Sequence, residues 1–521
     1  MKIFPQSAAY PRLTVAMIVA NEQDVLAESV DSVRPIADEV VILDTGSTDE
    51  TPQLAQRLGA RVQQMPWAND FAAARNRCLE AASGDFVLWL DAGERVAAES
   101  AGGLREFIDQ KPDPRTVYSL WVEVPPADSG GSAEQIAQPR LIPRAAGLRF
   151  QGRVRETLWP AIRAAGLETA IAATRIIRHP RQHDCERSTL KAKRNLSLAL
   201  LEAAETAVPP PRILLALGEA HSVLGSPERA REAFAAALRS AERGSAEMLE
   251  AHYGLLTTLD DDPQQQTRRV TTCRDALEVF PFDMQLLLAM GNYLLGQQRQ
   301  DLAIRFFDAA VRWGATTPEV WHLKDIQEAG AVCLSLALQG AERDEEAGAA
   351  LQDGLRRHPD SLRIQQHLLN LDIKKGWTEQ ALAVADRMTM DADARPAFRE
   401  AVRGACKAGQ GRWSEALAAL ENAYRLECRS PLCLRWLSFT HIALGQNEAA
   451  RPILQQWQQL EPHNAEAQTC LEQIGPPPQD LTPPAVEKTV PPSTRHRRID
   501  PGTSPGDRPR KLTGAKAGGR R

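Results

Sequence analysis

The sequence lacks the features of a membrane-spanning, disulfide-stabilised or zinc-binding protein. Its eight cysteines form no CxxC pair and have no histidines at zinc-ligand spacing. Free thiols in a reducing compartment are the simplest explanation. The longest apolar runs have only the length of a strand, and no charged-then-apolar leader opens the chain. We therefore expect a soluble, cytoplasmic protein, with peripheral attachment to the inner membrane as the alternative.

Two common phosphate-binding signatures are also missing. No GxxxxGK[ST] and no GxGxxG follows any candidate strand, which argues against P-loop and dinucleotide-binding folds. What is present instead is VVILDTGSTDET at residues 40–51. A buried strand is expected to end at Asp44, and Gly46 allows the turn that follows. In open α/β sheets, ligands bind outside the carboxyl ends of strands, where a carboxylate can accept hydrogen bonds from a ribose or a base.

The first hundred residues alternate between strand and helix patterns. The expected strands are residues 13–19, 39–43, 61–65 and 86–90, and the expected helices are 24–33, 51–58 and 71–82. This alternation predicts βαβ units and a mostly parallel sheet with helices on both faces. The fourth strand leads into Asp91-Ala92-Gly93-Glu94, which brings a second acidic loop to the sheet edge of Asp44. The two acidic loops together suggest a site that binds a nucleotide and a metal ion.

Four segments, taken in order, resemble the motifs of family 2 glycosyltransferases with the GT-A fold, a Rossmann-like α/β fold. The segments are MIVANEQ, VVILDTGSTDET, FAAARN and GDFVLWLDAGE, and the resemblance covers residues 13–185. It is strongest with a bacterial group that carries tetratricopeptide repeats (TPR). It implies that Asn21, Glu22 and Asp44 hold the nucleoside of a UDP-sugar or another NDP-sugar. It further implies that Arg75 and Asn76 lie near the diphosphate or the sugar.

The sequence departs from the family pattern at two positions. Asp91 begins the metal-binding DxD element, but Gly93 replaces its second Asp, so that Glu94 is the other candidate ligand for Mn²⁺ or Mg²⁺. Relatives often read G-R-x-H-E where this chain has Gly152-Arg153-Val154-Arg155-Glu156. Because a guanidinium matches phosphate oxygens, we predict that Arg155 stabilises the leaving diphosphate and that metal dependence is weakened or absent.

The resemblance implies an inverting displacement at the anomeric carbon. Glu156 is the candidate general base, and Asp91 is the candidate for contact with the diphosphate or metal. The alternative for Glu156 is an ordinary surface glutamate. His179 is a further candidate at the end of this domain, and its alternative is an ordinary polar residue.

From residue 186 to 474 strand signals disappear and Ala, Leu, Glu, Arg and Gln dominate. A Gly-x-x-x-x-Ala pattern recurs at Gly376, Gly411 and Gly445, with spacings of 35 and 34 residues, and earlier at Gly225. This period is typical of TPR helix pairs, and small residues suit helices that cross closely. We expect an all-α solenoid of about six or seven units, with 321–345 matching poorly. Its groove is expected to bind an acceptor peptide or protein, and rigid spacing or dimerisation is the alternative.

Residues 475–521 form a third region. Prolines cluster there, and from Arg495 onward nine Lys or Arg face two Asp. Such a tail is expected to be disordered, and to have no specific nucleic-acid partner. The division is therefore 1–185 catalytic, 186–474 solenoid and 475–521 tail.

Three functions are compatible with these features. The leading prediction is an NDP-sugar glycosyltransferase with a TPR array that binds the acceptor. The second is a catalytically degenerate GT-A domain in a protein-interaction scaffold, and the weakest is a nucleotidyltransferase on a similar fold.

Overall fold

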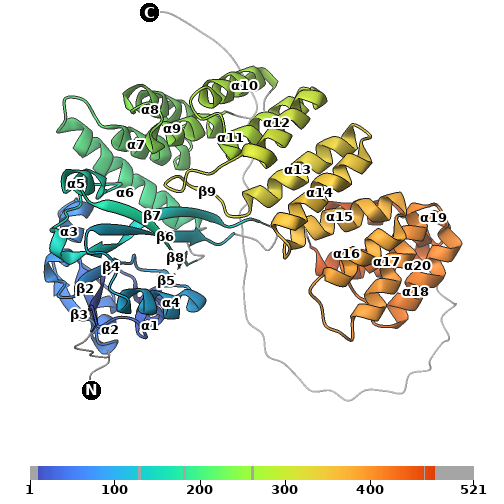
Figure 1. Ribbon diagram of the computed structural model, residues 1–521, viewed down its shortest axis with the longest axis horizontal. Coiled ribbons are helices and arrows are strands. Elements are labelled where there is room, and N and C mark those ends of the chain that lie inside the picture. Colours follow the sequence, from blue (N-terminus) through green and yellow to red (C-terminus); the bar gives the residue numbers. More distant parts are fainter. Residues whose placement is uncertain (1–9, 127–130, 180–183, 260–262, 463, 476–521) are drawn as a thin grey trace, which may run out of the picture.

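The computed structural model describes residues 10–126, 131–179, 184–259, 263–462 and 464–475 (Figure 1). An α/β domain at the N-terminus is followed by a long array of helices, as the sequence predicts. The basic, Pro-rich tail for which we predict disorder lies almost wholly outside the described residues.

The N-terminal domain contains a single mixed sheet with the order β3-β2-β1-β4-β7-β6-β8-β5. The strands are β1 (Leu13–Val19), β2 (Glu39–Asp44), β3 (Arg61–Gln64), β4 (Phe86–Trp89), β5 (Glu94–Val96), β6 (Thr116–Val124), β7 (Glu134–Pro143) and β8 (Glu168–Arg178). The first four pair in parallel, as predicted. The second half is mixed, because β6 and β7 follow one another as a hairpin, which is an antiparallel connection.

Helices cover both faces of the sheet, and alternate strand residues form the two cores. On one face Val15 and Met17 pack with α1 and α4, and on the other Ala16 packs with α3. The helices of this domain are α1 (Gln23–Val33), α2 (Thr51–Arg57), α3 (Phe71–Ala81), α4 (Ala98–Asp109) and α5 (Trp159–Ala164), with a short 3₁₀ turn at Arg144–Ala146. The three layers hold the carboxyl ends of β1, β2 and β4 at one edge.

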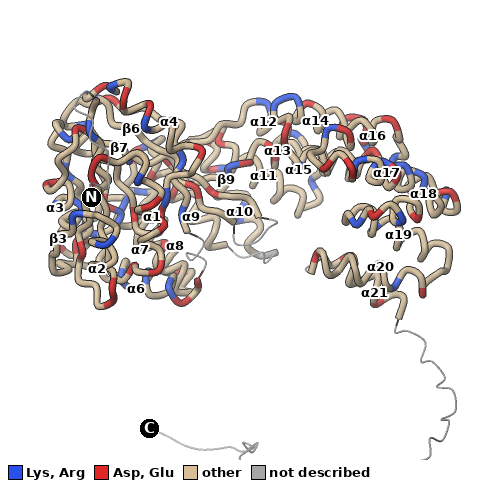
Figure 2. Tube along the Cα trace, turned by 90° about the horizontal axis from the view of Figure 1, so that it is seen from below, with Lys and Arg blue, Asp and Glu red and all other residues tan. Residues whose placement is uncertain are grey.

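The rest of the described chain is helical apart from one short strand. Helix α6 (Cys185–Ala204) comes first, then seven antiparallel pairs and a final helix α21 (Ala465–Gln473). The pairs are α7 (Pro211–Val223) with α8 (Pro227–Ser240), α9 (Ala246–Thr257) with α10 (Pro263–Leu277), α11 (Met284–Gly296) with α12 (Gln300–Trp313), α13 (Ile326–Gly340) with α14 (Asp344–Arg357), α15 (Leu362–Lys375) with α16 (Thr378–Arg387), α17 (Arg395–Gly409) with α18 (Trp413–Arg425), and α19 (Pro431–Ala443) with α20 (Asn447–Leu460). Figure 2 shows the array curving from α14 through α18 to α21.

The two small residues of the repeated Gly-x-x-x-x-Ala pattern have different roles. The alanines, for example Ala381 and Ala416, are completely buried where paired helices cross, as expected. The glycines instead end the first helix of a pair in the left-handed region, with φ of +68° at Gly376 and +75° at Gly411. At Gly411 an added Cβ would meet nothing within 4 Å, so the turn alone explains this glycine, whereas at Gly376 a Cβ would also meet the Gln410 side chain, in line with a close crossing.

The solenoid also contributes a strand, which the sequence did not predict. Within the poorly matched segment, β9 (His322–Leu323) pairs antiparallel with the start of β7. Two further backbone bonds extend this contact, from Lys324 N–H to the carbonyl of Ala133 at 2.9 Å and from Ala137 N–H to the carbonyl of Pro318 at 2.7 Å. The connection between α12 and α13 therefore fastens the solenoid to the edge of the sheet.

Candidate functional site

The loops that follow β1 and β2 are fastened to each other. Asn21, in the left-handed region with φ of +56°, accepts a hydrogen bond from Thr48 N–H at 2.8 Å through its amide oxygen. The backbone N–H of Glu22 donates to the Thr51 hydroxyl at 2.8 Å. Asp44, only 3% exposed, accepts from Ser47 N–H at 3.1 Å. These contacts hold together the two loops of the predicted nucleoside site and use part of the hydrogen-bonding capacity of Asn21 and Asp44.

Arg75 on α3 joins the two predicted catalytic carboxylates. Its Nη1 lies 3.1 Å from Asp91 Oδ1, and its Nε donates to Glu156 Oε1. The guanidinium also stacks on the ring of Trp89, with its carbon 4.4 Å from the ring centroid. Burial opposes the charge of Arg75, but the carboxylates of Asp91 and Glu156 raise its pKa above the ordinary value. Residues far apart in the sequence thus meet at one point.

The two candidate metal ligands are surrounded by N–H donors. Asp91 accepts from the Trp89 indole at 2.9 Å and lies 3.5 Å from Arg140. Burial alone would raise the pKa of Asp91, but Arg75, Arg140 and Arg178 keep it well below its usual range. Glu94 is 2% exposed, and its Oε1 accepts from both Arg140 and Arg178 at 2.9 Å.

This arrangement does not fit a divalent cation held between Asp91 and Glu94. The remaining oxygen of Glu94 accepts from Asp91 N–H at 3.0 Å, so the carboxylates face donors and cations. Gly93 offers no carboxylate, and its own N–H donates to the Ser29 hydroxyl at 3.0 Å. A hard cation requires several free oxygen ligands. Across the described parts of the chain, no group of three or more His, Cys, Asp or Glu could hold a metal ion.

Asn76 anchors a loop. Its amide nitrogen donates to the carbonyl of Phe150 at 2.9 Å, and its amide oxygen accepts from Phe150 N–H at 2.8 Å. These reciprocal bonds fix the segment that leads to Glu156. Asn76 therefore positions the site, whereas the resemblance implied a contact with the diphosphate or sugar.

Arg155 turns toward the solenoid. Its φ of +49° directs the guanidinium to Glu219 on α7 and Glu250 on α9, and it forms an ion pair with each. Burial opposes its charge, and the two glutamates hold the pKa of Arg155 above its ordinary value. In this geometry the Arg155 guanidinium, which we predicted to stabilise the leaving diphosphate, is already paired with two glutamates. Arg155 instead joins the domains beside Glu156.

His179 lies behind the Asp91 loop. Its backbone N–H donates to the carbonyl of Gly93 at 2.7 Å, and its Nε2 is 4.0 Å from Glu28. A small cavity of about 240 Å³ lies at this place, between α1 and β5. The His179 backbone thus fixes the loop that carries Asp91.

Helix α6 has a basic face that was not predicted from the sequence, and we define this face as Arg187, Lys191 and Arg194. Arg187 pairs with Glu22 at 3.2 Å, and the charge of Arg194 interacts with Glu22 and Glu156. The charge of Lys191 interacts with Asp91. The spacing of four and three residues indicates that the three cations share one side of a helix, but they lie beyond the predicted domain boundary at 185.

Two protein-family models match separate parts of the chain. Residues 14–129 match the model for glycosyl transferase family 2. This segment is a family 2 glycosyltransferase domain. Residues 407–474 match a tetratricopeptide repeat model, which confirms the predicted repeats at the end of the solenoid. Both parts of the resemblance drawn from the sequence are thus confirmed.

Individual relatives match only part of this chain. A TPR repeat-containing protein of Synechococcus elongatus is 43% identical over 103 residues, 20% of this chain and 26% of the relative. An uncharacterized glycosyltransferase of Rickettsia conorii is 34% identical over 91 residues, 17% of this chain and 31% of the relative. The chain thus spans about a quarter to a third of the length of these curated relatives.

Among solved structures, glucosyl-3-phosphoglycerate synthase from Mycobacterium tuberculosis, in complex with Mn²⁺, UDP and its product, is 25% identical. The match covers 22% of this chain and 43% of that chain, with a TM-score of 0.17.

In the described residues no helix is both long and apolar enough to cross a membrane. Basic and acidic residues are interspersed along the described trace (Figure 2).

Proposed function

We propose that this protein transfers a sugar from a nucleotide-diphosphate sugar, with a UDP-sugar as the first candidate, to an acceptor with inversion at the anomeric carbon. The observation that carries the proposal is the Asp91–Arg75–Glu156 cluster, in which Arg75 and Asp91 lie within the residues that match glycosyl transferase family 2. The cluster lies beside the loops of Asn21 and Asp44, which are the proposed nucleoside site. Open α/β sheets bind ligands at this edge.

In the proposed reaction an acceptor hydroxyl or other nucleophile attacks the anomeric carbon of the donor. Glu156 takes the acceptor proton while the bond from the anomeric carbon to the diphosphate oxygen breaks. The electron pair of that bond leaves with the nucleoside diphosphate. Arg75 orients Glu156 through the Nε contact, and its cationic fork lies where negative charge develops.

The acceptor is proposed to be a polypeptide. From α11 to α19 the first helices of successive pairs contact one another, as in α13–α15 and α15–α17, and form an inner layer, and α7 likewise contacts α9. The ion pairs of Arg155 with Glu219 and Glu250 bring α7 and α9, two of these first helices, next to the position of Glu156. A chain bound along the solenoid would therefore reach the proposed base. The eight free thiols suit a cytoplasmic location, with or without peripheral attachment to the inner membrane, which we also propose.

A scaffold without catalysis is the second candidate, and one observation favours it. Gly93 replaces a carboxylate, and those of Asp91 and Glu94 are held by arginines. A domain that has lost its activity would keep such ion pairs for stability. Partner binding by the solenoid would then be the whole function.

A transfer assay separates these candidates. The full chain is incubated with a panel of NDP-sugars and a peptide library, and the peptides are examined for sugar addition by mass spectrometry. The proposal predicts transfer by the wild type and a loss of at least about 100-fold in E156Q, since the proton acceptor is removed.

The matched control is E168Q, because Glu168 is an exposed glutamate at the start of β8. Its transfer should equal that of the wild type. Peptide binding without transfer from any donor would favour the scaffold.

A further inference from the structure

Helix α6 presents its basic face to the candidate site. Arg187, Lys191 and Arg194 are separated by four and three residues, so they lie along one side of the helix. Figure 1 shows α6 running between the sheet and the first solenoid helices. Glu22 pairs with Arg187, and Asp91 and Glu156 act on Lys191 and Arg194 respectively. The face thus extends from the nucleoside loop to the catalytic cluster.

Lys191 differs from its neighbours in the contacts that the structure describes. Among the described residues it forms no hydrogen bond and no ion pair, whereas Arg75, Arg140 and Arg178 each contact Asp91 or Glu94. An exposed ammonium that lies close to other cations and makes no direct ion pair within the described residues is suited to bind an anion.

The charge balance of the cluster points the same way. Asp91 lies near four cations, which are Arg75, Arg140, Arg178 and Lys191. The arginines among them contact three carboxylates, which are Asp91, Glu94 and Glu156. A divalent cation placed there would meet guanidinium groups and would lack free oxygen ligands. A diphosphate would meet hydrogen-bond donors of the opposite charge.

We propose that Lys191, together with Arg178, binds the diphosphate of the nucleotide donor and takes the place of the divalent cation. This inference rests on the proposed glycosyltransferase function and goes beyond it by assigning the diphosphate-binding residues. As the bond to the anomeric carbon breaks, its electron pair adds negative charge to the leaving diphosphate. The Lys191 ammonium neutralises that charge without giving up its proton.

The test is nucleotide binding by the full chain, measured by calorimetry in EDTA and again in Mn²⁺. The probes are UDP, GDP and TDP, each compared with its monophosphate. We expect a diphosphate to bind in EDTA and K191M to weaken that binding about 10-fold to 100-fold, as for loss of a charge-assisted hydrogen bond. Binding of the monophosphate should change less than about threefold, because the second phosphate is the proposed contact.

The control is K193M on the same helix, because Lys193 is also exposed and its substitution removes the same charge. It should bind like the wild type, and equal melting temperatures would show that both variants fold. Diphosphate binding that requires Mn²⁺, or that K191M leaves unchanged, would overturn the inference while the glycosyltransferase proposal stands. Absence of nucleotide binding in both conditions would overturn both.

Discussion

Arg75 determines how the acidic residues of the site are arranged. It is 12% exposed, and one guanidinium contacts both Asp91 and Glu156, which are separated by 65 positions in the sequence. A planar fork can hold two carboxylates at fixed positions, which a flexible ammonium cannot. Its contact with the Trp89 ring restricts it further. Glu156 can therefore face an acceptor in a defined orientation.

Arg155 shows what the residue pattern alone could not reveal. The sequence places it one position before Glu156, and a cation next to a catalytic site is reasonably assigned to a phosphate. The structure gives it two glutamates from helices that begin more than fifty residues later. Long-range partners of this kind leave no local signal, whereas the strand preceding Asp44 is recorded in its own apolar run.

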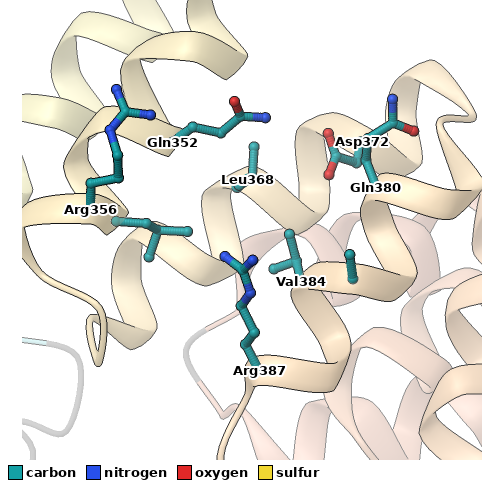
Figure 3. Close-up of a pocket in the computed structure, with 9 residues that line it drawn as sticks. Gln352, Arg356, Leu368, Asp372, Gln380, Val384 and Arg387 are labelled. Carbon is teal, nitrogen blue, oxygen red and sulfur yellow. The ribbon is translucent and has the colours of Figure 1, made fainter.

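Asp372 is a buried acid outside the proposed site. It is 2% exposed, and its Oδ2 has no hydrogen-bond partner among the described residues. Figure 3 shows it at a groove between α14, α15 and α16 with a volume of about 430 Å³. Leu368 and Val384 line the same groove. Burial raises the pKa of Asp372 to about 7.

A pH-dependent cost to stability follows for Asp372. Its unfolded pKa is about 3.9, so the folded state binds the proton more tightly between about pH 4 and pH 7. The cost is absent below about pH 4 and complete above about pH 7, where it reaches roughly 4 kcal/mol. We expect D372N, which carries no charge, to melt at a higher temperature than the wild type at pH 8 and at a similar temperature at pH 4.

D360N serves as the control, since Asp360 is exposed on the preceding loop. Its melting temperature should follow that of the wild type at both pH values. A difference between D372N and the wild type that does not change with pH would show that burial of the charge has no such cost.

At the scale of elements, the local pattern predicted the parallel half of the sheet well. The strand expected at 13–19 is β1 itself, and the helix expected at 71–82 ends one residue earlier, at Ala81. These elements have strong periodicity and clear breaks. The two-residue strand β9 could not be predicted, because it has no period of its own and depends on the free edge of β7.

The candidate site was predictable to a similar degree. Asp44 and Asp91 follow apolar strands, so their place at the sheet edge could be inferred. The basic face of α6 was not assigned to the site, because a helix after the last strand was taken as part of the solenoid. Its position over the site depends on tertiary packing, which no single segment encodes.

The strand β9 provides a direct test of how the solenoid is attached. Replacing Lys324 with Pro removes the N–H that donates to Ala133 and also the 2.7 Å ion pair with Glu123. We expect the Ala137 amide, which donates to Pro318, to exchange with deuterium at least about tenfold faster in K324P. Hydrogen exchange followed by mass spectrometry measures this rate.

K324M is the control, because it keeps the backbone donor and loses only the ion pair. Its Ala137 exchange should remain within about threefold of the wild type, since partly exposed ion pairs contribute little. Unchanged exchange in K324P would show that β9 does not hold the solenoid to the sheet.

At the scale of the whole molecule, two of the described contacts between the solenoid and the N-terminal domain lie far apart. One is the β9 contact with β7, and the other is the group of ion pairs that Arg153 and Arg155 make with Glu205, α7 and α9. Two attachments fix the direction of the solenoid better than one. A polypeptide on the inner layer would therefore approach the proposed base along a defined path.

The central claim is that the Asp91 cluster catalyses sugar transfer, and donor turnover tests it most directly. Release of nucleoside diphosphate from a panel of NDP-sugars is measured for the wild type, D91N and D393N. Asp393 is an exposed solenoid residue and serves as the control. We predict release by the wild type and by D393N, and a loss of at least about 100-fold in D91N at an unchanged fold. No release from any donor by the wild type, or equal release by D91N, would contradict the account.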